Sequence, residues 1–532
     1  MAAIASILVL ALSGGSGPPG SKHTVLLTRV LTMIERHYRA VGSLGAPVLD
    51  YQVGELWRRG IDGSGTTIAV IEAWNNPGIA SFTAKFDRAL GLPEAQITTI
   101  FPTGRHRLPA SCPPGMLKLG HYGSCRGWAG EEGIDVLFAH LLAPYARILV
   151  AVAPPDSEIT DDAASQVAPP EFIQAVEYLS LHHLANVISI SDDSAESTYS
   201  HGSEEIHAQD PGELMAAANG IPVLVAGGDC DAAQHLAVSG DGCTAGDITT
   251  RQATGVWDDS PWVTAVGGSI PNLSATGKRL GPDRVWNLAS TGSPEGEAAG
   301  FSAVYTRPGY QNSVAAITRS KWRSVPDITM DAAGGTSGSA PLFAGVLALA
   351  SQLNHGKNVG PINNVLYRVR GPAGLKDGIA DIVSGNNTLI INGKIFVRGF
   401  TATKGFDIAS GWGTVRANTF APALARATQA AHQNAAARAR AAAALTRLEH
   451  REQLSNSYVG QAGTTLLTAQ GFLPRHPVKL YVDGRKIATL HASEQGSVRY
   501  GIKPSALGLL PGRHMVELVS ILITTTNAFQ SR

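Results

Sequence analysis

The arrangement of hydrophobic residues predicts alternating strands and helices over most of the chain. Short apolar runs rich in valine, isoleucine and alanine occur at 66–71, 147–153, 187–191 and 222–226, and helix-like stretches separate them. Continuous apolar runs of this length are typical of strands that are buried on both faces. Because strands that alternate with helices form parallel pairs, residues 48–420 are predicted to form an α/β domain with a doubly wound, mostly parallel sheet.

Two different patterns precede this domain. Residues 1–13 combine an apolar stretch with a small-residue end, which is typical of a secretory signal peptide, although the basic start of such peptides is missing. Residues 14–47 begin with a flexible Gly/Ser/Pro-rich stretch, and apolar residues then recur at helical spacing from Thr24 to Ala40. We therefore predict a secreted, extracellular protein whose N-terminal helix packs on the α/β domain.

The composition changes again after the α/β domain. Residues 421–454 are rich in alanine and arginine and lack glycine, so they are predicted to form one long helix that acts as a spacer. From 455 to 532, short alternating segments such as 478–482 and 485–490 predict a small β-sandwich. A substrate-binding role and a stabilising role for this module both agree with the pattern.

Charge and cysteine content restrict the class of protein. The 42 basic and 42 acidic residues cancel, and charged residues make up only 16% of the chain, so no nucleic-acid partner is expected. Beyond the N-terminus no apolar run is long enough to span a membrane. The four cysteines form two sequence pairs, Cys112 with Cys125 and Cys230 with Cys243, and two local disulfides suit an oxidising compartment.

The first candidate catalytic residue is Ser337, which lies in the sequence Gly335-Thr336-Ser337-Gly338. The glycines favour a tight strand-to-helix turn, and the apolar run that follows at 341–350 has the content of a buried helix. The N-terminus of that helix would favour negative charge close to the serine. We therefore interpret Ser337 as a nucleophile; a Gly/Ser-rich turn that only caps a core helix is the alternative.

A serine nucleophile needs a base, and the segment 130–142 offers two carboxyl groups. Glu131 and Asp135 are four residues apart, so in a helix they lie on one face within hydrogen-bond reach. Two carboxyl groups this close share a proton, which raises one pKa and leaves the other group as a base suited to acidic conditions. An acidic first turn that complements the helix dipole is the alternative.

A third candidate carboxyl group follows a buried strand. Residues 221–226 are apolar and lead through two glycines to Asp229. In open α/β sheets, functional groups collect at the carboxyl ends of the strands. A protonated Asp229 would donate a hydrogen bond to an oxyanion, whereas an ordinary turn aspartate after a strand is the alternative.

Taken together, these residues resemble the sedolisin family of serine-carboxyl peptidases. The matching segments run in the family's order: Val70-Ile71-Glu72, 130–135, Ile188-Ser189-Ile190-Ser191, 226–229, 263–269, 300–302, 325–327 and 335–337. The resemblance covers roughly residues 48–420 and implies a subtilisin-like fold.

The resemblance also implies a role for each candidate residue. Ser337 corresponds to the nucleophile, Glu131 to the general base, Asp135 to the partner of that base and Asp229 to the acid that stabilises the oxyanion. The implied reaction is cleavage of protein or peptide substrates by an endopeptidase, through an acyl-enzyme and at acidic pH.

Members of the family bind one structural calcium ion, and the corresponding residues are present near the end of the domain. The implied ligands are the carboxylates of Asp381 and Asp407 and the main-chain carbonyls of Ile382, Thr403 and Gly405. Oxygen ligands of this kind suit Ca²⁺. Thr403 replaces a glycine that is more usual in the family, which a carbonyl ligand tolerates. Two unconnected turn acids are the alternative.

The chain departs from the family pattern at three places. The interval from Asp327 to Gly335 is short, Asp192-Asp193 follows a strand after which tryptophan and glycine are common, and only about 48 residues precede the peptidase region. We expect either that activation differs from that of typical members or that the beginning of the chain is truncated. The leading interpretation is a secreted, monomeric, calcium-stabilised endopeptidase. A catalytically silent relative that acts in extracellular binding is the alternative, and a subtilisin-like enzyme with a serine–histidine pair is a weaker one.

Overall fold

The structure is a computed structural model. It describes residues 19–41, 45–103, 125–154, 169–192, 194–199, 202–207, 209–236, 242–368, 378–429, 435, 438–440, 453–454, 458–470, 472, 477–483, 485–493, 495–519 and 524–531. The predicted signal peptide at 1–13 lies outside these residues, as does Cys112. Within the described ranges, none of the helices combines the length and the apolar character needed to cross a membrane.

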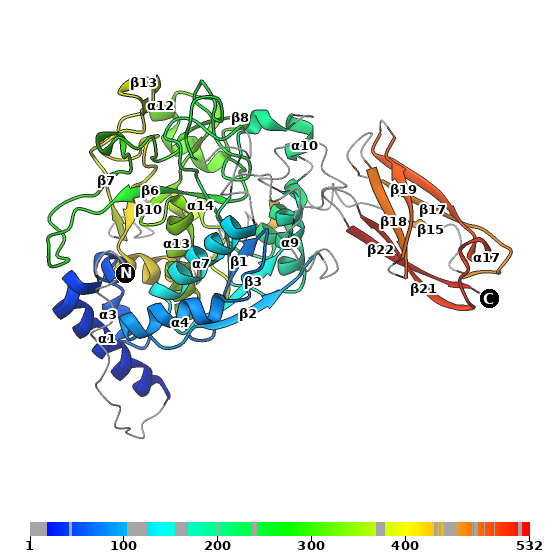
Figure 1. Cartoon of the computed structure of the whole chain (residues 1–532), viewed down its shortest axis with the longest axis horizontal. Coiled ribbons are helices and arrows are strands. Elements are labelled where there is room, and N and C mark those ends of the chain that lie inside the picture. Colours follow the sequence, from blue (N-terminus) through cyan, green and yellow to red (C-terminus); the bar gives the residue numbers. More distant parts are fainter. Residues whose placement is uncertain are drawn as a thin grey trace.

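An eight-stranded sheet forms the centre of the α/β domain (Figure 1), in the order β10-β6-β5-β4-β1-β3-β2 with β7 beside β6. The strands are β1 (Thr67–Glu72), β2 (Gln96–Ile100), β3 (Arg147–Val152), β4 (Val187–Ile190), β5 (Val223–Ala226), β6 (Thr264–Ile270), β7 (Arg284–Val285) and β10 (Ile328–Asp331). All neighbours pair in parallel except β6 and β7. Every residue of β1, β4 and β5 is buried, as expected for strands covered on both faces. The predicted doubly wound, mostly parallel sheet is confirmed.

Helices and smaller elements surround this sheet. The helices are α2 (Ala46–Asp50), α3 (Gly54–Trp57), α4 (Ile79–Leu90), α7 (Cys125–Leu142), α9 (Glu171–Leu181), α10 (Ser203–His207), α11 (Asp210–Ala218), α12 (Ala315–Thr318), α13 (Thr336–Leu353), α14 (Asn363–Leu366) and α15 (Ala417–Gln429), with 3₁₀ turns η3 (Glu196–Thr198), η4 (Ala289–Thr291) and η5 (Gly309–Val314). Short strand pairs are β8 (Gly300–Thr306) with β9 (Trp322–Val325), β11 (Ile379–Ala380) with β14 (Thr414–Val415), and β12 (Leu389–Ile391) with β13 (Lys394–Val397). Helix α13 is almost entirely buried, which confirms the buried helix predicted after Ser337.

The predicted N-terminal helix is present as α1 (Pro19–Val41) and packs on the α/β domain. Its apolar face contributes Leu27, Leu31 and Ile34 to the core that also contains Trp57 of α3. A Cβ atom at Gly54 would lie 2.8 Å from a methyl carbon of Leu31, so a larger residue here would force the Leu31 side chain between α1 and α3 to shift.

The predicted spacer helix at 421–454 differs from the structure at both ends. Helix α15 begins earlier, at Ala417, because Phe420 and Leu424 pack into the core, and it is described as far as Gln429. Strand β15 (Gln453–Leu454) occupies the predicted end of the helix, where it pairs with β17. Composition alone did not show this end because strand pairing overrides local helix propensity.

The C-terminal strands form two sheets, as the β-sandwich prediction requires. One sheet contains β15, β17 (Thr465–Gln470) and β20 (Ser497–Ile502); the other contains β16 (Tyr458–Val459), β18 (Pro477–Val482), β19 (Arg485–His491), β21 (Gly512–Val519) and β22 (Thr524–Ser531), and the short helix α17 (Pro504–Leu507) follows β20. Leu467 and Val498 of the first sheet share one hydrophobic core with Leu480 and Val516 of the second. Figure 1 shows this module beside the α/β domain.

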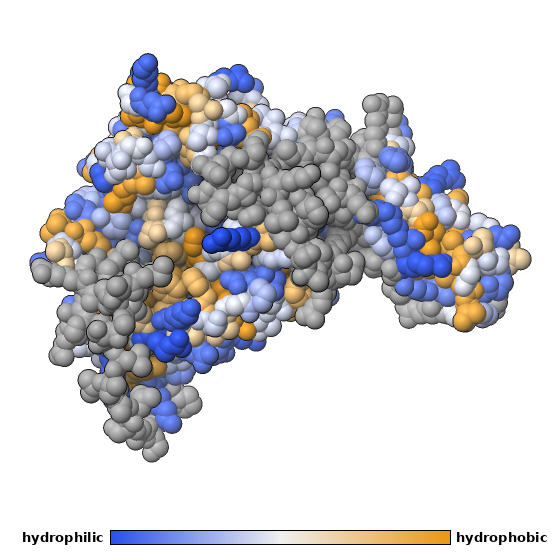
Figure 2. Space-filling model, viewed as in Figure 1, coloured by the Kyte–Doolittle hydropathy of each residue, from blue (hydrophilic) through white to orange (hydrophobic). Residues whose placement is uncertain are grey.

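Among the described residues, large exposed apolar side chains are scattered over the surface. On the face shown in Figure 2, hydrophilic and hydrophobic residues are interspersed over the described parts. Large exposed apolar side chains such as Leu181, Leu280, Ile395 and Leu510 come from separate elements. Isolated residues of this kind are normal on a folded protein.

Candidate active site

The candidate catalytic residues converge at the carboxyl ends of the central strands. Glu72 is the last residue of β1, Asp229 follows β5, and Ser337 follows β10 after a short turn. Glu131 and Asp135 lie on α7, which packs against α13 (Figure 1). The sheet topology therefore gathers these groups at the edge where α/β enzymes place their active sites.

Close packing of α7 on α13 brings Glu131 to Ser337. A Cβ atom at Gly338 would lie 3.2 Å from the Phe138 ring, and one at Gly345 would lie 3.0 Å from Cβ of Leu142, so glycines on α13 allow the approach. Glu131 lies seven residues before Phe138, on the same face of α7. Because α7 begins at Cys125, its first turn contains no acidic residue, and the helix-dipole interpretation of Glu131 is not supported.

The backbone around Ser337 is held in a turn that only these residues permit. Gly335 has φ 73°, and a Cβ atom there would lie 2.3 Å from Oδ2 of Asp229. Pro341 has no N–H, so it cannot donate to the Ser337 carbonyl one turn earlier. The Ser191 hydroxyl donates to this carbonyl instead, at 3.2 Å.

The side chains of Ser337 and Glu131 lie close enough for the serine to lower the pKa of the carboxyl group. The pKa of Glu131 is raised to about 7. Burial is the largest cause of the rise, the interaction with Ser337 opposes it, and the charge of Asp229 adds to it. A carboxylate that accepts a hydrogen bond from a serine hydroxyl is placed to remove its proton. The Glu131 carboxyl group therefore lies beside Ser337, and the catalytic roles of the two residues stay a prediction.

Two further buried acids, Asp135 and Glu72, lie close to Glu131. Burial, and then the charge of Glu131, raise the pKa of Asp135 well above its usual range, while hydrogen bonds with Ser191 and Glu72 lower it. Burial and the charge of Asp135 likewise raise the pKa of Glu72. Both acids have 0% exposed surface. Two buried carboxyl groups this close cannot both ionise at low cost, so the pair favours a state in which one of them holds a proton.

Sequence reasoning missed the role of Glu72. The residue entered that reasoning only as part of a matching segment, and the signal that identifies it is a single acid at the end of an otherwise apolar strand. All six residues of β1 are buried, and an acid in such a position needs a partner.

Asp229 is held with one oxygen available for a proton. The backbone N–H of Thr336 donates to Asp229 Oδ1 at 2.8 Å, and the Thr336 hydroxyl donates to the same oxygen at 2.7 Å. Burial raises the pKa of Asp229, the two bonds from Thr336 lower it, and the charge of Glu295 raises it. Because Oδ1 is already an acceptor, Oδ2 is the oxygen that carries a proton when Asp229 is neutral.

Known proteins were then compared with this chain. No protein-family model matches it. Kumamolisin of Bacillus sp. (strain MN-32) is 27% identical over 435 residues, which cover 78% of this chain and 70% of kumamolisin. Mouse tripeptidyl-peptidase 1 is 29% identical over 231 residues, but these cover only 38% of this chain and 37% of that protein.

The solved structure of Pseudomonas sedolisin, a serine-carboxyl proteinase, has the same fold. It superimposes with a TM-score of 0.54 and 22% identity, and the match covers 69% of this chain and 94% of that one. The chain belongs to the sedolisin family. Its relatives are serine-carboxyl peptidases with a subtilisin-like fold.

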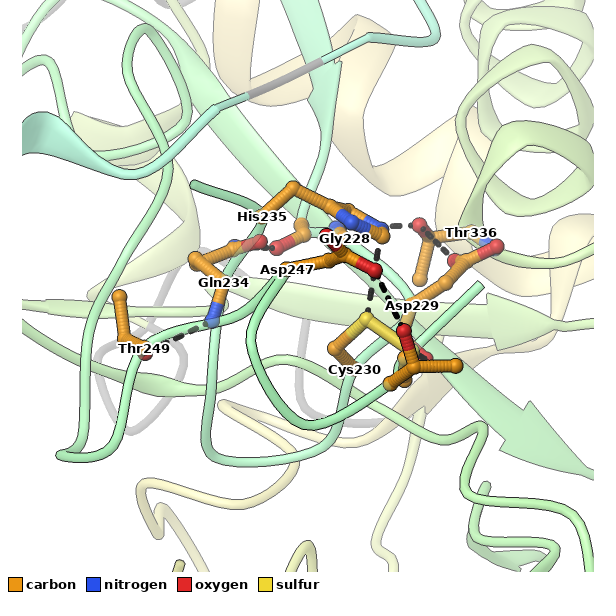
Figure 3. The surroundings of a disulfide bond; sticks show 11 residues. Gly228, Asp229, Cys230, Gln234, His235, Asp247, Thr249 and Thr336 are labelled. Carbon is orange, nitrogen blue, oxygen red and sulfur yellow. Dashed lines mark hydrogen bonds between the residues drawn. A yellow bond between two sulfur atoms is a disulfide. The ribbon is translucent and has the colours of Figure 1, made fainter. Parts of the chain in front are cut away.

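In this sedolisin-family protein a disulfide fixes the loop after Asp229 (Figure 3). Cys230 and Cys243 are bonded, as predicted, and Sγ of Cys243 lies 3.3 Å from the Asp229 carbonyl oxygen. Nε2 of His235 lies 3.3 Å from Sγ of Cys230. Both sulfur atoms are used in the disulfide, so this cluster is not a zinc site. The other predicted pair includes Cys112, which lies outside the described residues.

The residues expected to bind calcium also come together in the sedolisin-family domain. The Gly405 N–H donates to Oδ2 of Asp381 at 2.9 Å, and the Thr403 N–H donates to Oδ2 of Asp407 at 2.6 Å. Burial raises the pKa of Asp407 to about 6, and the charge of Asp381 adds to this rise. Ile382, the fifth residue of the set, is buried directly after Asp381. Two adjacent carboxyl groups beside carbonyl-bearing loops fit the oxygen-rich sites that Ca²⁺ prefers.

Proposed function

We propose that this protein is a secreted endopeptidase that cleaves proteins or peptides through an acyl-enzyme formed on Ser337. The closeness of the Glu131 carboxyl group to Ser337, in a site where burial raises the pKa of that group, carries the proposal. The family relationship supports it, since kumamolisin and sedolisin are serine-carboxyl peptidases.

In the proposed acylation step, Oγ of Ser337 attacks the scissile carbonyl carbon while the Glu131 carboxylate takes the hydroxyl proton. Collapse of the tetrahedral intermediate expels the amine, which receives that proton from Glu131. Water then attacks the ester with Glu131 as base again, and Ser337 recovers its proton. Asp135 and Glu72, which share a proton, hold Glu131 in position.

Asp229 is the proposed oxyanion donor. In its neutral form the Oδ2–H group would donate to the oxyanion, while Thr336 holds Oδ1 in place. The hydrogen bond from this neutral carboxyl group becomes stronger as negative charge develops on the carbonyl oxygen. It therefore stabilises the transition state more than the substrate.

This mechanism needs a single proton on the pair formed by Glu131 and Asp229. When both are protonated no base is present, and when both are ionised no carboxyl proton remains for the oxyanion. Activity is therefore highest between two apparent pKa values of the pair. Burial raises the pKa of Asp229 above its ordinary value of 3.8 and that of Glu131 to about 7. We infer a bell-shaped profile with its maximum on the acidic side of neutrality.

We further propose that residues 48–420 are the peptidase domain and that Ca²⁺ stabilises it. The ion would be held by the carboxylates of Asp381 and Asp407 with the carbonyls of Ile382, Thr403 and Gly405, and it would supply structural cross-linking. The 455–532 sandwich would be an accessory module. Secretion as a monomer agrees with the Cys230–Cys243 disulfide.

Cleavage of an unfolded protein substrate, followed from about pH 2.5 to 8, tests the proposal. The wild-type chain should show an acid-peaked profile, and Ser337→Ala and Glu131→Ala should both abolish cleavage. If well-folded wild-type protein cleaves nothing at any pH, the catalytically silent relative becomes the better interpretation.

A further inference from the structure

A second pocket lies at the edge of the central sheet opposite the catalytic groups. Its volume is about 540 Å³, and its lining includes Val223 and Thr264, the first residues of β5 and β6. Asp229 follows the other end of β5. Sites for small molecules have volumes of roughly 300 to 1,000 Å³. This pocket is therefore large enough for a small molecule and separate from the peptidase site.

Flat and rigid side chains form the walls of the pocket. They are Pro222, Pro261, Trp262, Pro308, Tyr310 and Pro361. Proline and aromatic side chains lose little conformational entropy when a ligand binds. Their faces also suit a planar ring, which stacks on aromatic and proline surfaces.

A buried ion pair fixes the floor of the pocket. Arg323 and Asp327 have 0% exposed surface, and Nη2 of Arg323 lies 2.7 Å from Oδ2 of Asp327. The Tyr367 hydroxyl donates to Oδ1 of Asp327 at 2.6 Å, and Asn363 Nδ2 donates to Oδ2 at 3.2 Å. Because these groups satisfy one another, the floor is formed before any ligand arrives.

The rim of the pocket is positively charged. Arg368 and Arg440 line it, and no aspartate or glutamate belongs to its described lining. Nη2 of Arg440 donates to Asn364 Oδ1 at 3.3 Å, so its hydrogen-bonding partner there is a neutral amide. Two guanidinium groups without a lining acid favour an anionic ligand, and carboxylate is a group that guanidinium binds well.

We propose that this pocket binds a small aromatic carboxylate, whose ring lies against Trp262 and Tyr310 and whose carboxylate pairs with Arg368 and Arg440. A free aromatic amino-acid derivative and the C-terminal residue of a short peptide share this chemistry. The inference does not depend on the peptidase mechanism.

Ligand binding at this pocket would also anchor the segment that leads to the C-terminal sandwich. Arg440 belongs to that segment, and Nε of Arg438 donates to the Ala218 carbonyl at 2.9 Å. A carboxylate bound by Arg440 would add to the two attachments that Arg438 and Arg440 already make to the peptidase domain.

Fluorine NMR on the full chain tests the proposal, with N-acetyl-4-fluoro-L-phenylalanine as the probe and its carboxamide as the matched neutral compound. The wild-type protein should broaden the probe signal saturably, and the carboxamide should bind about tenfold more weakly because it cannot form the charged pair. Displacement by N-acetyl-alanyl-phenylalanine would show that peptide C-termini bind, whereas displacement by N-acetylphenylalanine alone would show that only small aromatic acids do.

The variants locate the site. In Arg368→Gln/Arg440→Gln, affinity for the probe should fall about tenfold, to that of the carboxamide, with peptidase activity unchanged. Arg416→Gln changes an exposed arginine outside the pocket and should leave binding intact. Equal binding of probe and carboxamide to wild type, or unchanged probe binding in the double variant, would overturn the proposal.

Discussion

The two edges of the central sheet carry two different buried polar networks. At the carboxyl edge, burial raises the pKa values of Glu131, Asp135 and Glu72, and the charges of neighbouring acids, Asp229 in the case of Glu131, add to the rise. At the amino edge, Asp327 is equally buried but pairs with Arg323. The carboxyl-edge network consists of acids, so it needs a bound proton to supply a hydrogen-bond donor. In the amino-edge network, Arg323 and Tyr367 supply the donors to Asp327. The comparison separates a network suited to proton transfer from one suited to structural rigidity.

The networks should also respond differently to pH. A carboxyl group whose pKa rises on folding destabilises the protein as the pH increases from its unfolded to its folded pKa. The carboxyl-edge acids should therefore lower stability as the pH rises from about 4.5 through 7.

The largest expected effect is on activity at the carboxyl edge. Glu131→Gln keeps the shape of the side chain but removes the base, so kcat/KM should fall by about 10⁴-fold or more. The same change removes a carboxyl group with a raised pKa, so Tm at pH 8 should stay equal or rise. Loss of activity together with a large fall in Tm would show that the residue acts through the fold instead.

The next effect is on stability at the amino edge. Arg323→Met leaves Asp327 buried without a cation, which should cost about 3–5 kcal/mol of unfolding free energy. Denaturant unfolding measures this loss, and the double variant Arg323→Met/Asp327→Asn should recover part of it. If the single variant is as stable as wild type, the pair does not hold this edge together.

Asp229→Asn tests the division of roles within the active site. An amide donates to the oxyanion at any pH, so the alkaline decline of activity should disappear. What remains is a rise as Glu131 ionises, below its wild-type pKa of about 7 because the charge of Asp229 no longer raises it. The weaker donor should lower kcat by about 10²-fold. The pH dependence of kcat/KM decides the matter, and a variant that keeps the bell-shaped profile would contradict the role given to Asp229.

Removal of calcium should have a moderate effect on stability. If Ca²⁺ is present at about 100 times its Kd, chelation should cost about 2.7 kcal/mol and lower Tm. Mg²⁺ should not restore Tm, since it is smaller and requires octahedral geometry. Asp381→Asn should make Tm insensitive to the chelator. A variant that still responds to chelation would place the ion elsewhere.

The smallest effect is expected for Glu72→Gln. The amide N–H donates to Asp135 and favours its ionised form, whose charge raises the pKa of Glu131 and moves the activity profile to higher pH. A loss in kcat of about tenfold is expected, as for other positioning groups. Glu132→Gln is the comparison variant, because its carboxylate accepts a hydrogen bond from the Asn76 N–H while its charge also raises the pKa of Asp135 and Glu72, so it reports the effect of removing a nearby charge alone. Identical shifts in both variants would exclude a specific role for Glu72.

The sequence predicted the placement of residues whose position depends only on neighbouring residues in the chain. The spacing of Glu131 and Asp135 predicts one helix face, and the glycines before Ser337 predict the turn. Glu72 was missed because its importance arises when β1 is placed beside α7. The Arg323–Asp327 pair and the second pocket were missed for the same reason, since Pro222, Tyr310 and Arg440 meet only in the folded chain.

The most direct test of the central claim is to look for the acyl-enzyme. The wild-type chain would be mixed with the p-nitrophenyl ester of N-acetylphenylalanine at mildly acidic pH, quenched in acid and digested for mass spectrometry. The proposed mechanism predicts an acyl group on the peptide that contains Ser337, with none in Ser337→Ala and slower formation in Glu131→Gln. Ester turnover by wild type without an adduct, or with the adduct on another residue, would contradict it.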